Sequence, residues 1–342
     1  MTTERYGQER RDADGQPPDA RFRSGVAAGA FDLPLPGAGN TAERFAALAR
    51  LGEADPVLAR LAEGHADALA ILAELDGPPA GDGRWGVWAA VPRSLTARRD
   101  GAIWLIDGDR PWCSGAGVCT RALVTAAAPD GIRLFAVDNP GTALEGTWPA
   151  VGMAASDSRT VRFTGVPAVP VGGPGDYTAR PGFWHGGIGV AACWYGGAVG
   201  VARPLLAAAR AQREKHRAAT GGDRPEAAGV APPDPHLLAH LGAVDARLAA
   251  AGALLRAAAA TVDADPKADL RRLTGQVRAT VEATATEVLD RVGRALGAGP
   301  LCRDGRHARR VADLTVYLRQ SHAEADLAGL GEQVAAEEDP RW

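Results

Sequence analysis

The stretch ALVTAAAPDGIRLFAV, residues 122–137, consists of two apolar runs joined through an Asp-Gly pair. Such a pair between apolar runs indicates a β-hairpin, because both residues tolerate the backbone conformation of a tight turn. Further short apolar runs occupy 102–106, 161–163 and 168–171, with Gly, Pro, Asp and Asn between them. Strands at this spacing predict a small antiparallel barrel or sandwich. We therefore expect a β-domain over residues 81–178.

The sequence on either side of this block has the spacing of helices. Apolar residues recur every three or four positions through 41–75, which predicts a shortened N-terminal helical part over 41–80. After residue 179, four further helical segments are expected, at about 182–217, 236–262, 269–296 and 306–330. Four long helices around one apolar core predict a C-terminal bundle over 179–332.

The two ends of the chain are expected to lie outside these units. The N-terminus is charged and lacks the apolar stretch of a signal peptide, so residues 1–40 are interpreted as a disordered lead-in. Residues 333–342 are interpreted as a short tail. The most apolar segment, 186–211, contains Arg203 and Arg210, so we expect a buried helix there and no membrane span.

Charge and cysteine content narrow the class of protein. A formal net charge of -3 gives no basic surface, so we expect no nucleic-acid partner. The 4 cysteines are scattered without a Cys-x-x-Cys pair, so neither a disulfide framework nor a metal site is expected. Cysteines used in this way are typical of a reducing compartment, and we expect a cytoplasmic protein.

The segment GDRPWCSGA, residues 108–116, follows a predicted strand. It resembles a flavin-contacting segment of the acyl-CoA dehydrogenase superfamily, in which an aromatic residue packs near the isoalloxazine ring and a hydroxyl group bonds the flavin edge near N5. The resemblance implies these roles for Trp112 and Ser114, with Cys113 and Gly115 beside them as cofactor-binding residues. The alternative is that Trp112 is an aromatic residue of the barrel core and Ser114 a turn residue.

The order of helices, β-domain and bundle also resembles that superfamily, from about residue 41 to 330. The implied fold is α+β and acyl-CoA dehydrogenase-like: N-terminal helices, a small antiparallel β-barrel domain and a C-terminal four-helix bundle. The resemblance implies FAD as cofactor, with FMN as the alternative, and a homodimer or homotetramer. It also implies that Gly297 and Gly299 approach the cofactor of a neighbouring subunit; a helix C-cap is the other interpretation, and the two are compatible.

Two further residues are expected near the substrate. Ser158 lies in a segment, 152–163, that resembles the family's stretch leading into a strand near the flavin. The alternative for this segment is a plain loop followed by an edge strand. His185 follows Phe183-Trp184 at the start of the long helix, so it is placed to face the flavin cavity.

The sequence departs from the family pattern in two places. The loop that carries Thr-Glu-Pro in the family corresponds to residues 89–95 here and keeps only Pro92. The catalytic Glu of the last helix is also missing, and its position falls at Ser321 or His322.

His322 is therefore the candidate catalytic residue. A histidine titrates near neutral pH and can act as a general base. Flavin-dependent monooxygenases of the same fold carry a His beside the flavin in their last helix, and His322 resembles it. Arg319 flanks His322 and is assigned to the same pocket. The alternative is an ordinary histidine on the helix surface or in the core.

Three functions stay open at this point. The first is a flavin-dependent oxidoreductase that oxidises an acyl thioester or a related small molecule, with acyl-CoA as the expected partner. The second is a flavin-dependent monooxygenase that receives reduced flavin from a reductase. The third is a non-catalytic chain that keeps the fold as a binding or assembly module, a hypothesis motivated by the missing Glu.

Overall fold

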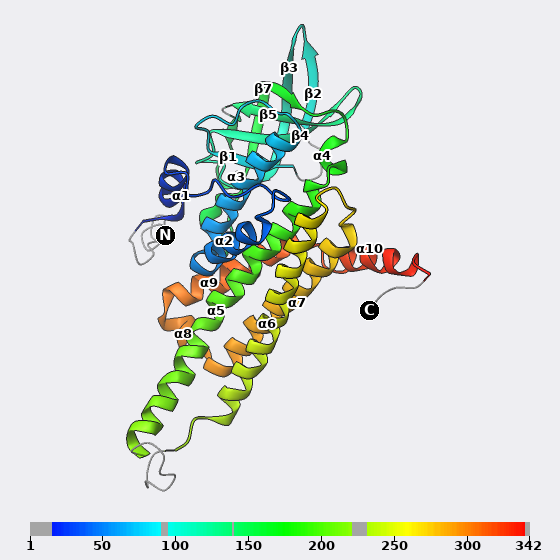
Figure 1. Cartoon of the computed structure of the whole chain (residues 1–342). Helices are drawn as coiled ribbons and strands as arrows, with labels where there is room; N and C mark the ends of the chain where they lie inside the picture. Colours follow the sequence, from blue (N-terminus) through cyan, green and yellow to red (C-terminus); the bar gives the residue numbers. More distant parts are fainter. Residues whose placement is uncertain (1–15, 90–94, 139, 221–230, 339–342) are drawn as a thin grey trace.

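The computed structural model describes residues 16–89, 95–138, 140–220 and 231–338. The long helices of the second half are α5 (Gly182–Thr220), α6 (Pro235–Ala264) and α7 (Arg271–Leu296). They run side by side away from a β-domain that forms one end of the molecule (Figure 1). The mixture of a small sheet and long helices confirms the predicted fold class.

In the described part of the chain, three helices precede the sheet: α1 (Pro18–Ala27), α2 (Thr41–Ala54) and α3 (Pro56–Glu74). The disordered lead-in predicted for residues 1–40 is wrong for α1. Phe22 of α1 is fully buried and stacks on Phe31, with ring centroids 6.0 Å apart. Both rings pack against Leu58 and Leu61 of α3. Two aromatic side chains thus fix a segment whose charged residues indicated disorder.

Within the described residues the β-domain is a 7-stranded sheet. Its strands are β1 (Trp85–Trp88), β2 (Leu95–Asp100), β3 (Ile103–Cys113), β4 (Arg121–Ala128), β5 (Gly131–Asp138), β6 (Thr142–Ala143) and β7 (Arg159–Val171). The order is β1-β4-β2-β3-β7-β5, and because β4 also pairs with β5, the sheet closes on itself. Trp88, Ile106, Phe135 and Phe163 fill its interior. The predicted barrel is therefore confirmed.

The β4–β5 hairpin forms as predicted, with Ala128 opposite Gly131, so its turn residues are Pro129 and Asp130 and Gly131 begins β5. Most other pairings are antiparallel, and β6 pairs with β7 in this way. However, β1 and β2 each pair with β4 in parallel, so the expectation of a purely antiparallel barrel is wrong at these two pairings.

The strands β3 and β7 are longer than their apolar runs suggested. β3 continues through Gly108, although the apolar run 102–106 ends before it. The register between β3 and β7 shifts between Ile106 and Gly108, so the strand passes this point with a local irregularity. The runs 161–163 and 168–171 belong to the single strand β7, in which Gly165 has a φ of 59°. Glycine adopts this conformation without steric cost, so the strand bends there without ending.

The shorter helical elements of the chain are η2 (Ala154–Ser156), α4 (Asp176–Ala179), α8 (Ala298–Arg303), α9 (Gly305–Tyr317), η3 (Leu318–Gln320) and α10 (Glu324–Ala335). The bundle core brings together Trp194 and Leu205 of α5, Val281 of α7 and Leu314 of α9. α2 packs closely on α5, where a side chain at Gly196 would clash with the carbonyl oxygen of Ala49. The Gly/Ala-rich segment is thus a buried helix, as predicted.

By length and hydropathy alone, α5 and α6 could each cross a membrane. The most apolar window of α5 is 61% buried inside the fold, as expected of a core helix. That of α6 is only 22% buried, so α6 presents an apolar side that the other described residues do not cover.

The last predicted helix, 306–330, is interrupted. α9 ends at Tyr317, η3 follows, and Ala323 has a φ of 48° before α10 begins in a new direction (Figure 1). Local side chains replace the helical hydrogen bonds: the backbone N–H of His322 donates to Asp326 Oδ2 (3.0 Å), and that of Ala323 to Ser321 Oγ (3.2 Å). His322 therefore lies in a bend, and the prediction that it belongs to a continuous helix is wrong.

Candidate active site

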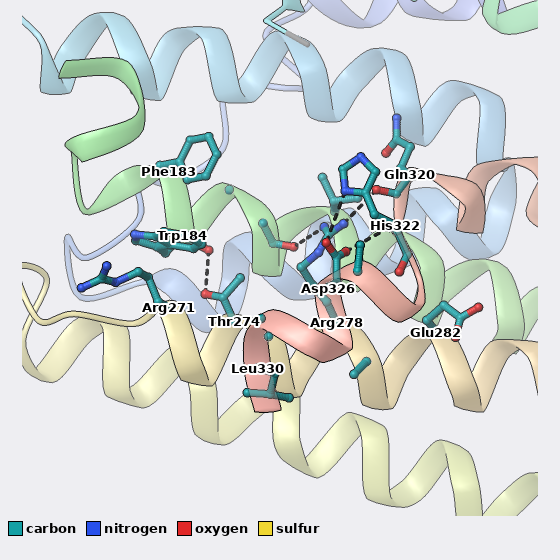
Figure 2. A pocket seen from close by; sticks show the side chains of 18 of the residues that line it. Phe183, Trp184, Arg271, Thr274, Arg278, Glu282, Gln320, His322, Asp326 and Leu330 are labelled. Atoms are coloured by element: carbon teal, nitrogen blue, oxygen red, sulfur yellow. Dashed lines mark hydrogen bonds and ion pairs between the residues drawn. The ribbon is translucent and has the colours of Figure 1, made fainter. Parts of the chain in front are cut away.

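A cavity of about 710 Å³ lies among α3, the start of α5, the first half of α7 and the η3–α10 segment. We call it the central cavity. Its size falls in the range of roughly 300–1,000 Å³ found for sites that bury organic ligands. Figure 2 shows Phe183 and Trp184 of α5 on one side of it and His322 with Gln320 on the other. The cavity can therefore enclose a planar organic ligand.

Aromatic and apolar side chains form one wall of the central cavity. Phe183 and Trp184 contact each other edge to face, with centroids 5.1 Å apart, and Leu330 of α10 lies across from α7. Thr274 of α7 donates its hydroxyl to the carbonyl oxygen of Trp184 (3.1 Å), which fixes the start of α5 against α7.

Arg278 of α7 joins three elements at the cavity wall. Its guanidinium donates to the carbonyl oxygens of Gly187 (3.2 Å) and Gln320 (3.1 Å) and lies 4.7 Å from the ring centre of Trp194. Burial lowers the pKa of this side chain below its usual value. Because Arg278 holds the carbonyl of Gln320, it positions the bend that contains His322.

The inner end of the cavity carries charged groups from α3. Arg60 bonds Glu63 Oε2 (2.5 Å), and Arg44 of α2 bonds Asp67 Oδ1 (2.8 Å). The side chain of Arg44 is 1% exposed. Burial raises the pKa of Glu63 to about 8, although Arg60 lowers it, and the neighbouring Asp67 adds to the increase. A buried carboxyl group that is neutral near pH 7 is available to give a proton.

His322 lines the central cavity, at its rim. The side chain is 79% exposed, and Nδ1 lies 3.3 Å from Asp326 Oδ1. Its catalytic role stays a prediction. Arg319 does not line the cavity; it forms an ion pair with Glu282, which does.

Trp112, Ser114, Ser156 and Ser158 form a second group, which we call the serine patch. Ser158 Oγ lies 2.9 Å from Ser114 Oγ and 2.8 Å from Ser156 Oγ, and the backbone N–H of Gly115 donates to the carbonyl of Ser156 (2.7 Å). Sequence reasoning placed Ser114 and Ser158 near one cofactor, and the structure brings them into contact. Ser156 completes the chain of hydroxyls.

Trp112 is 65% exposed and has a φ of 65°. Its ring meets Trp148 edge to face, 5.8 Å between centroids. The alternative that Trp112 is a barrel-core aromatic is therefore wrong. Cys113 instead points inward: its thiol donates to the carbonyl of Arg110 (3.2 Å), and burial raises its pKa. Its assignment as a cofactor contact is not supported by this inward placement.

Strand β1 connects the serine patch to the central cavity. Trp88 Nε1 donates to the carbonyl oxygen of Ser114 (2.9 Å), while Val87 and Ala89 line the cavity. Neighbouring residues of a strand point to opposite faces, so β1 lies between the two groups. The next residues, 90–94, carry most of the loop compared with Thr-Glu-Pro and lie outside the described residues.

Three of the predicted site residues lie elsewhere. His185 is buried and lines a separate hollow of about 520 Å³, so it does not line the central cavity, and its place near a flavin stays a prediction. Burial lowers its pKa. Gly297 and Gly299 lie at the α7–α8 junction, where a Cβ on either would meet no described atom within 4 Å. Gly297, with a φ of 64°, is the C-cap of α7, which confirms the capping alternative.

The residues that sequence reasoning missed are Arg60, Glu63, Asp67 and Arg278. One signal was present: Arg-x-x-Glu-x-x-x-Asp places three charges on one side of α3, whose other residues are mostly apolar. Charges on a buried helix need partners and mark a polar site.

No protein-family model and no curated protein matches this sequence. Solved structures do. TdsC from Paenibacillus sp. A11-2, in complex with FMN and indole, has a TM-score of 0.71 at 20% identity, over 94% of this chain and 96% of its own. KijD3, in complex with FMN and dTDP-3-amino-2,3,6-trideoxy-4-keto-3-methyl-D-glucose, has a TM-score of 0.74 at 21% identity, over 95% of this chain and 88% of its own. A nitrososynthase from Micromonospora carbonacea var. africana has a TM-score of 0.73 at 21% identity, over 93% of this chain and 89% of its own.

These similar structures share the acyl-CoA dehydrogenase-like fold of this chain, and those of TdsC and KijD3 contain FMN. The match extends over nearly the whole chain, and the order of helices, closed sheet and bundle is the one that this fold requires. The chain therefore has the acyl-CoA dehydrogenase-like fold.

Proposed function

We propose that this chain is a flavin-dependent monooxygenase that uses reduced flavin, FMN in preference to FAD, to oxygenate a small organic molecule. One observation carries the proposal: His322 lines the central cavity. The resemblance to the dehydrogenases of this fold puts the position of their catalytic Glu at Ser321 or His322. The structures of TdsC and KijD3 with FMN support the choice of flavin. TdsC is a dibenzothiophene monooxygenase, which supports the choice of reaction.

The residues present fit a flavin. Trp112 keeps an exposed ring in a backbone conformation that is unusual for a bulky residue, and it offers an aromatic wall to a planar ligand. Ser114 and Ser158 offer hydroxyl groups beside it. These three residues would hold the isoalloxazine ring and bond its edge.

When bound, reduced flavin supplies the electrons with which O₂ gives one oxygen atom to the substrate and the other to water. The chain's own part is to bind and to exclude water. Phe183 and Trp184 would cover an apolar substrate, Arg278 would hold the bend at the rim, and the His322 ring, bonded to Asp326, would accept a proton at its free nitrogen.

The test is flavin binding followed by turnover. We expect purified protein to bind reduced FMN under anaerobic conditions, measured by absorbance and fluorescence, and to consume O₂ when the flavin is supplied by a reductase. His322→Ala should slow oxygenation without loss of flavin binding, while Arg319→Ala serves as a matched control outside the cavity. A protein that binds neither FMN nor FAD, oxidised or reduced, would contradict the proposal and favour the non-catalytic hypothesis.

An acyl thioester substrate is the competing proposal. It predicts reduction of bound FAD by acyl-CoA without oxygen, read as bleaching of the flavin absorbance. Bleaching by acyl-CoA, together with no oxygenation by reduced FMN, would overturn the monooxygenase proposal in favour of a dehydrogenase.

We also propose that the chain forms a homodimer or homotetramer through α6. Small exposed residues follow one side of this apolar helix, at Ala239, Gly242, Ala246, Ala250, Ala253, Ala257 and Ala260. Small residues allow close contact between helices, and burial of this side would stabilise association. The double variant Ala250→Glu/Ala253→Glu should reduce the mass measured by light scattering, whereas a wild-type monomer would contradict the proposal.

A further inference from the structure

Arg278 differs from the other arginines that line the central cavity. Each of the others forms an ion pair: Arg60 with Glu63, Arg180 with Glu74 and Arg271 with Asp269. The carboxylates of the cavity likewise have partners of their own. Arg278 forms no ion pair with any residue that the structure describes, so its charge is available to a ligand.

Neutral groups hold the guanidinium of Arg278 in place. It donates to the carbonyl oxygens of Gly187 (3.2 Å) and Gln320 (3.1 Å), and its central carbon lies 4.7 Å from the ring centre of Trp194 (Figure 2). Gly187 permits this packing, because a Cβ there would lie 2.9 Å from Thr274 Cγ2. A guanidinium carries five N–H donors. Two bonds to carbonyl oxygens fix its position and leave donors for a ligand.

Arg278 lies close to the aromatic wall of the cavity. On α7 it follows Thr274, which bonds the carbonyl oxygen of Trp184, by four residues; on α5 its own partner Gly187 follows Trp184 by three. One turn of an α-helix rises ~5.4 Å. A flat molecule of one or two fused rings that packs on Phe183 and Trp184 can therefore place a substituent at Arg278.

A single unpaired positive charge at the wall of a cavity favours a ligand with a single negative charge, because a charge withdrawn from water needs a counter-ion. Burial lowers the pKa of Arg278, and the carboxyl groups of Asp326 and Glu63 oppose this effect. Each of the two is bonded to another side chain, His322 or Arg60. A carboxylate supplies one charge and two acceptor oxygens, which suits a guanidinium.

We propose that the substrate of this cavity is a small aromatic carboxylic acid, bound with its carboxylate on Arg278 and its ring against Phe183 and Trp184. This inference rests on the proposed function, since it names the substrate class of the same site. It makes Arg278 the residue by which the protein prefers a charged aromatic molecule to an uncharged one.

The first experiment measures binding without flavin. The probes are 2-naphthoate and its uncharged analogue 2-naphthamide, titrated into the full chain by isothermal titration calorimetry. The wild type should bind the carboxylate about tenfold more tightly than the amide, or better, the effect of one charge-assisted hydrogen bond. Arg278→Gln keeps a donor for the carbonyl oxygen of Gln320 and should abolish this preference. Its binding of the amide, which reports an intact cavity, should stay close to that of the wild type.

Two further variants serve as controls. Arg278→Lys keeps the charge and should keep part of the preference. Arg271→Met removes an exposed arginine at the edge of the same cavity whose charge Asp269 already neutralises, and it should leave the preference unchanged. Equal binding of the two probes by the wild type, no binding of 2-naphthoate, or a preference that survives Arg278→Gln overturns the proposal. The comparison in the wild type decides even if Arg278→Gln fails to fold.

The second experiment measures turnover of 2-naphthoate with reduced FMN supplied by a reductase. Arg278→Gln should raise the KM for 2-naphthoate about tenfold, as expected for a lost binding contact. If 2-naphthoate binds through Arg278 but the protein neither binds flavin nor consumes O₂, the monooxygenase function fails while the carboxylate site stands. If the protein oxygenates naphthalene but neither binds nor oxygenates 2-naphthoate, the function stands and the substrate class is wrong.

Discussion

The serine patch and the central cavity lie on the two sides of β1 and handle charge in opposite ways. The patch offers neutral hydroxyls and an exposed indole from one end of the barrel. The cavity places Arg60, Glu63, Asp67 and Arg278 against apolar walls. The two regions are therefore suited to different tasks. The neutral groups of the serine patch suit the binding of a flat ring, whereas the buried charged groups of the central cavity suit the movement of protons.

The largest expected effect is the loss of a charge partner at the cavity. Arg44→Met leaves the Asp67 carboxylate without its arginine in a buried position. Breaking a buried pair on one side costs about 3–5 kcal/mol in the free energy of unfolding, measured by denaturant titration. The control is Arg203→Met, which removes an exposed ion pair with Glu53 and should cost ~1 kcal/mol or less. Equal losses in the two variants would contradict the contrast between buried and exposed charge.

The next effect concerns pH. The pKa of Glu63 is raised from 4.5 to about 8, so between these values the folded protein binds more protons than the unfolded chain. Stability from this group is therefore fully present below pH 4.5 and falls as the pH rises through 8. The free energy of unfolding of the wild type should decline over this window relative to Glu63→Gln. Parallel pH profiles of the two proteins would show that Glu63 ionises normally.

A smaller effect is expected at the patch. Trp112→Ala should weaken flavin binding about tenfold, which is ~1.4 kcal/mol, because the ring loses its aromatic wall. The melting temperature should hardly change, since Trp112 is mostly exposed. Val151→Ala, also at an exposed apolar residue, is the control and should leave both flavin binding and stability unchanged. Flavin affinity that survives Trp112→Ala would remove the patch from the cofactor site.

The smallest effect separates the two glycines at the α7–α8 junction. Gly297→Ala forces a side chain into a left-handed conformation and should cost about 1 kcal/mol. Gly299→Ala has open space around it and no such φ, so stability should stay the same. Flavin binding by both variants, measured by fluorescence, should equal that of the wild type. Weaker binding by Gly299→Ala would instead support the contact with a neighbouring subunit's cofactor.

The parts predicted from sequence are those decided by neighbours in the chain. The Asp130-Gly131 pair indicated the β4–β5 hairpin, although the turn itself is Pro129-Asp130, and the segment 112–115 pointed to the serine patch. The central cavity could not be predicted in the same way, because α3, α5, α7 and η3–α10 meet only through tertiary packing. The sequence contains the charged residues of α3, but it does not reveal that Arg60 pairs with Glu63 and Arg44 with Asp67.

Two errors have local physical causes. α1 was missed because a charged composition outweighed Phe22, although one buried ring stacked on Phe31 is enough to dock a short helix. The helix predicted over 306–330 was wrong because its apolar spacing continues past Tyr317, while Ser321 and Asp326 capture the backbone N–H groups and break it. Side chains that bond locally can outweigh helical periodicity.

That break also decides how the cavity exchanges its contents. None of the side chains of α10, all of which the structure describes, is buried, yet Asp326 and Leu330 line the cavity. A helix with so little buried surface detaches at a small free-energy cost, long before the bundle unfolds. The amides of α10 should therefore exchange with deuterium much faster than those of α5. We therefore expect molecules to pass between solvent and the central cavity when α10 detaches locally, while the helices of the bundle stay folded.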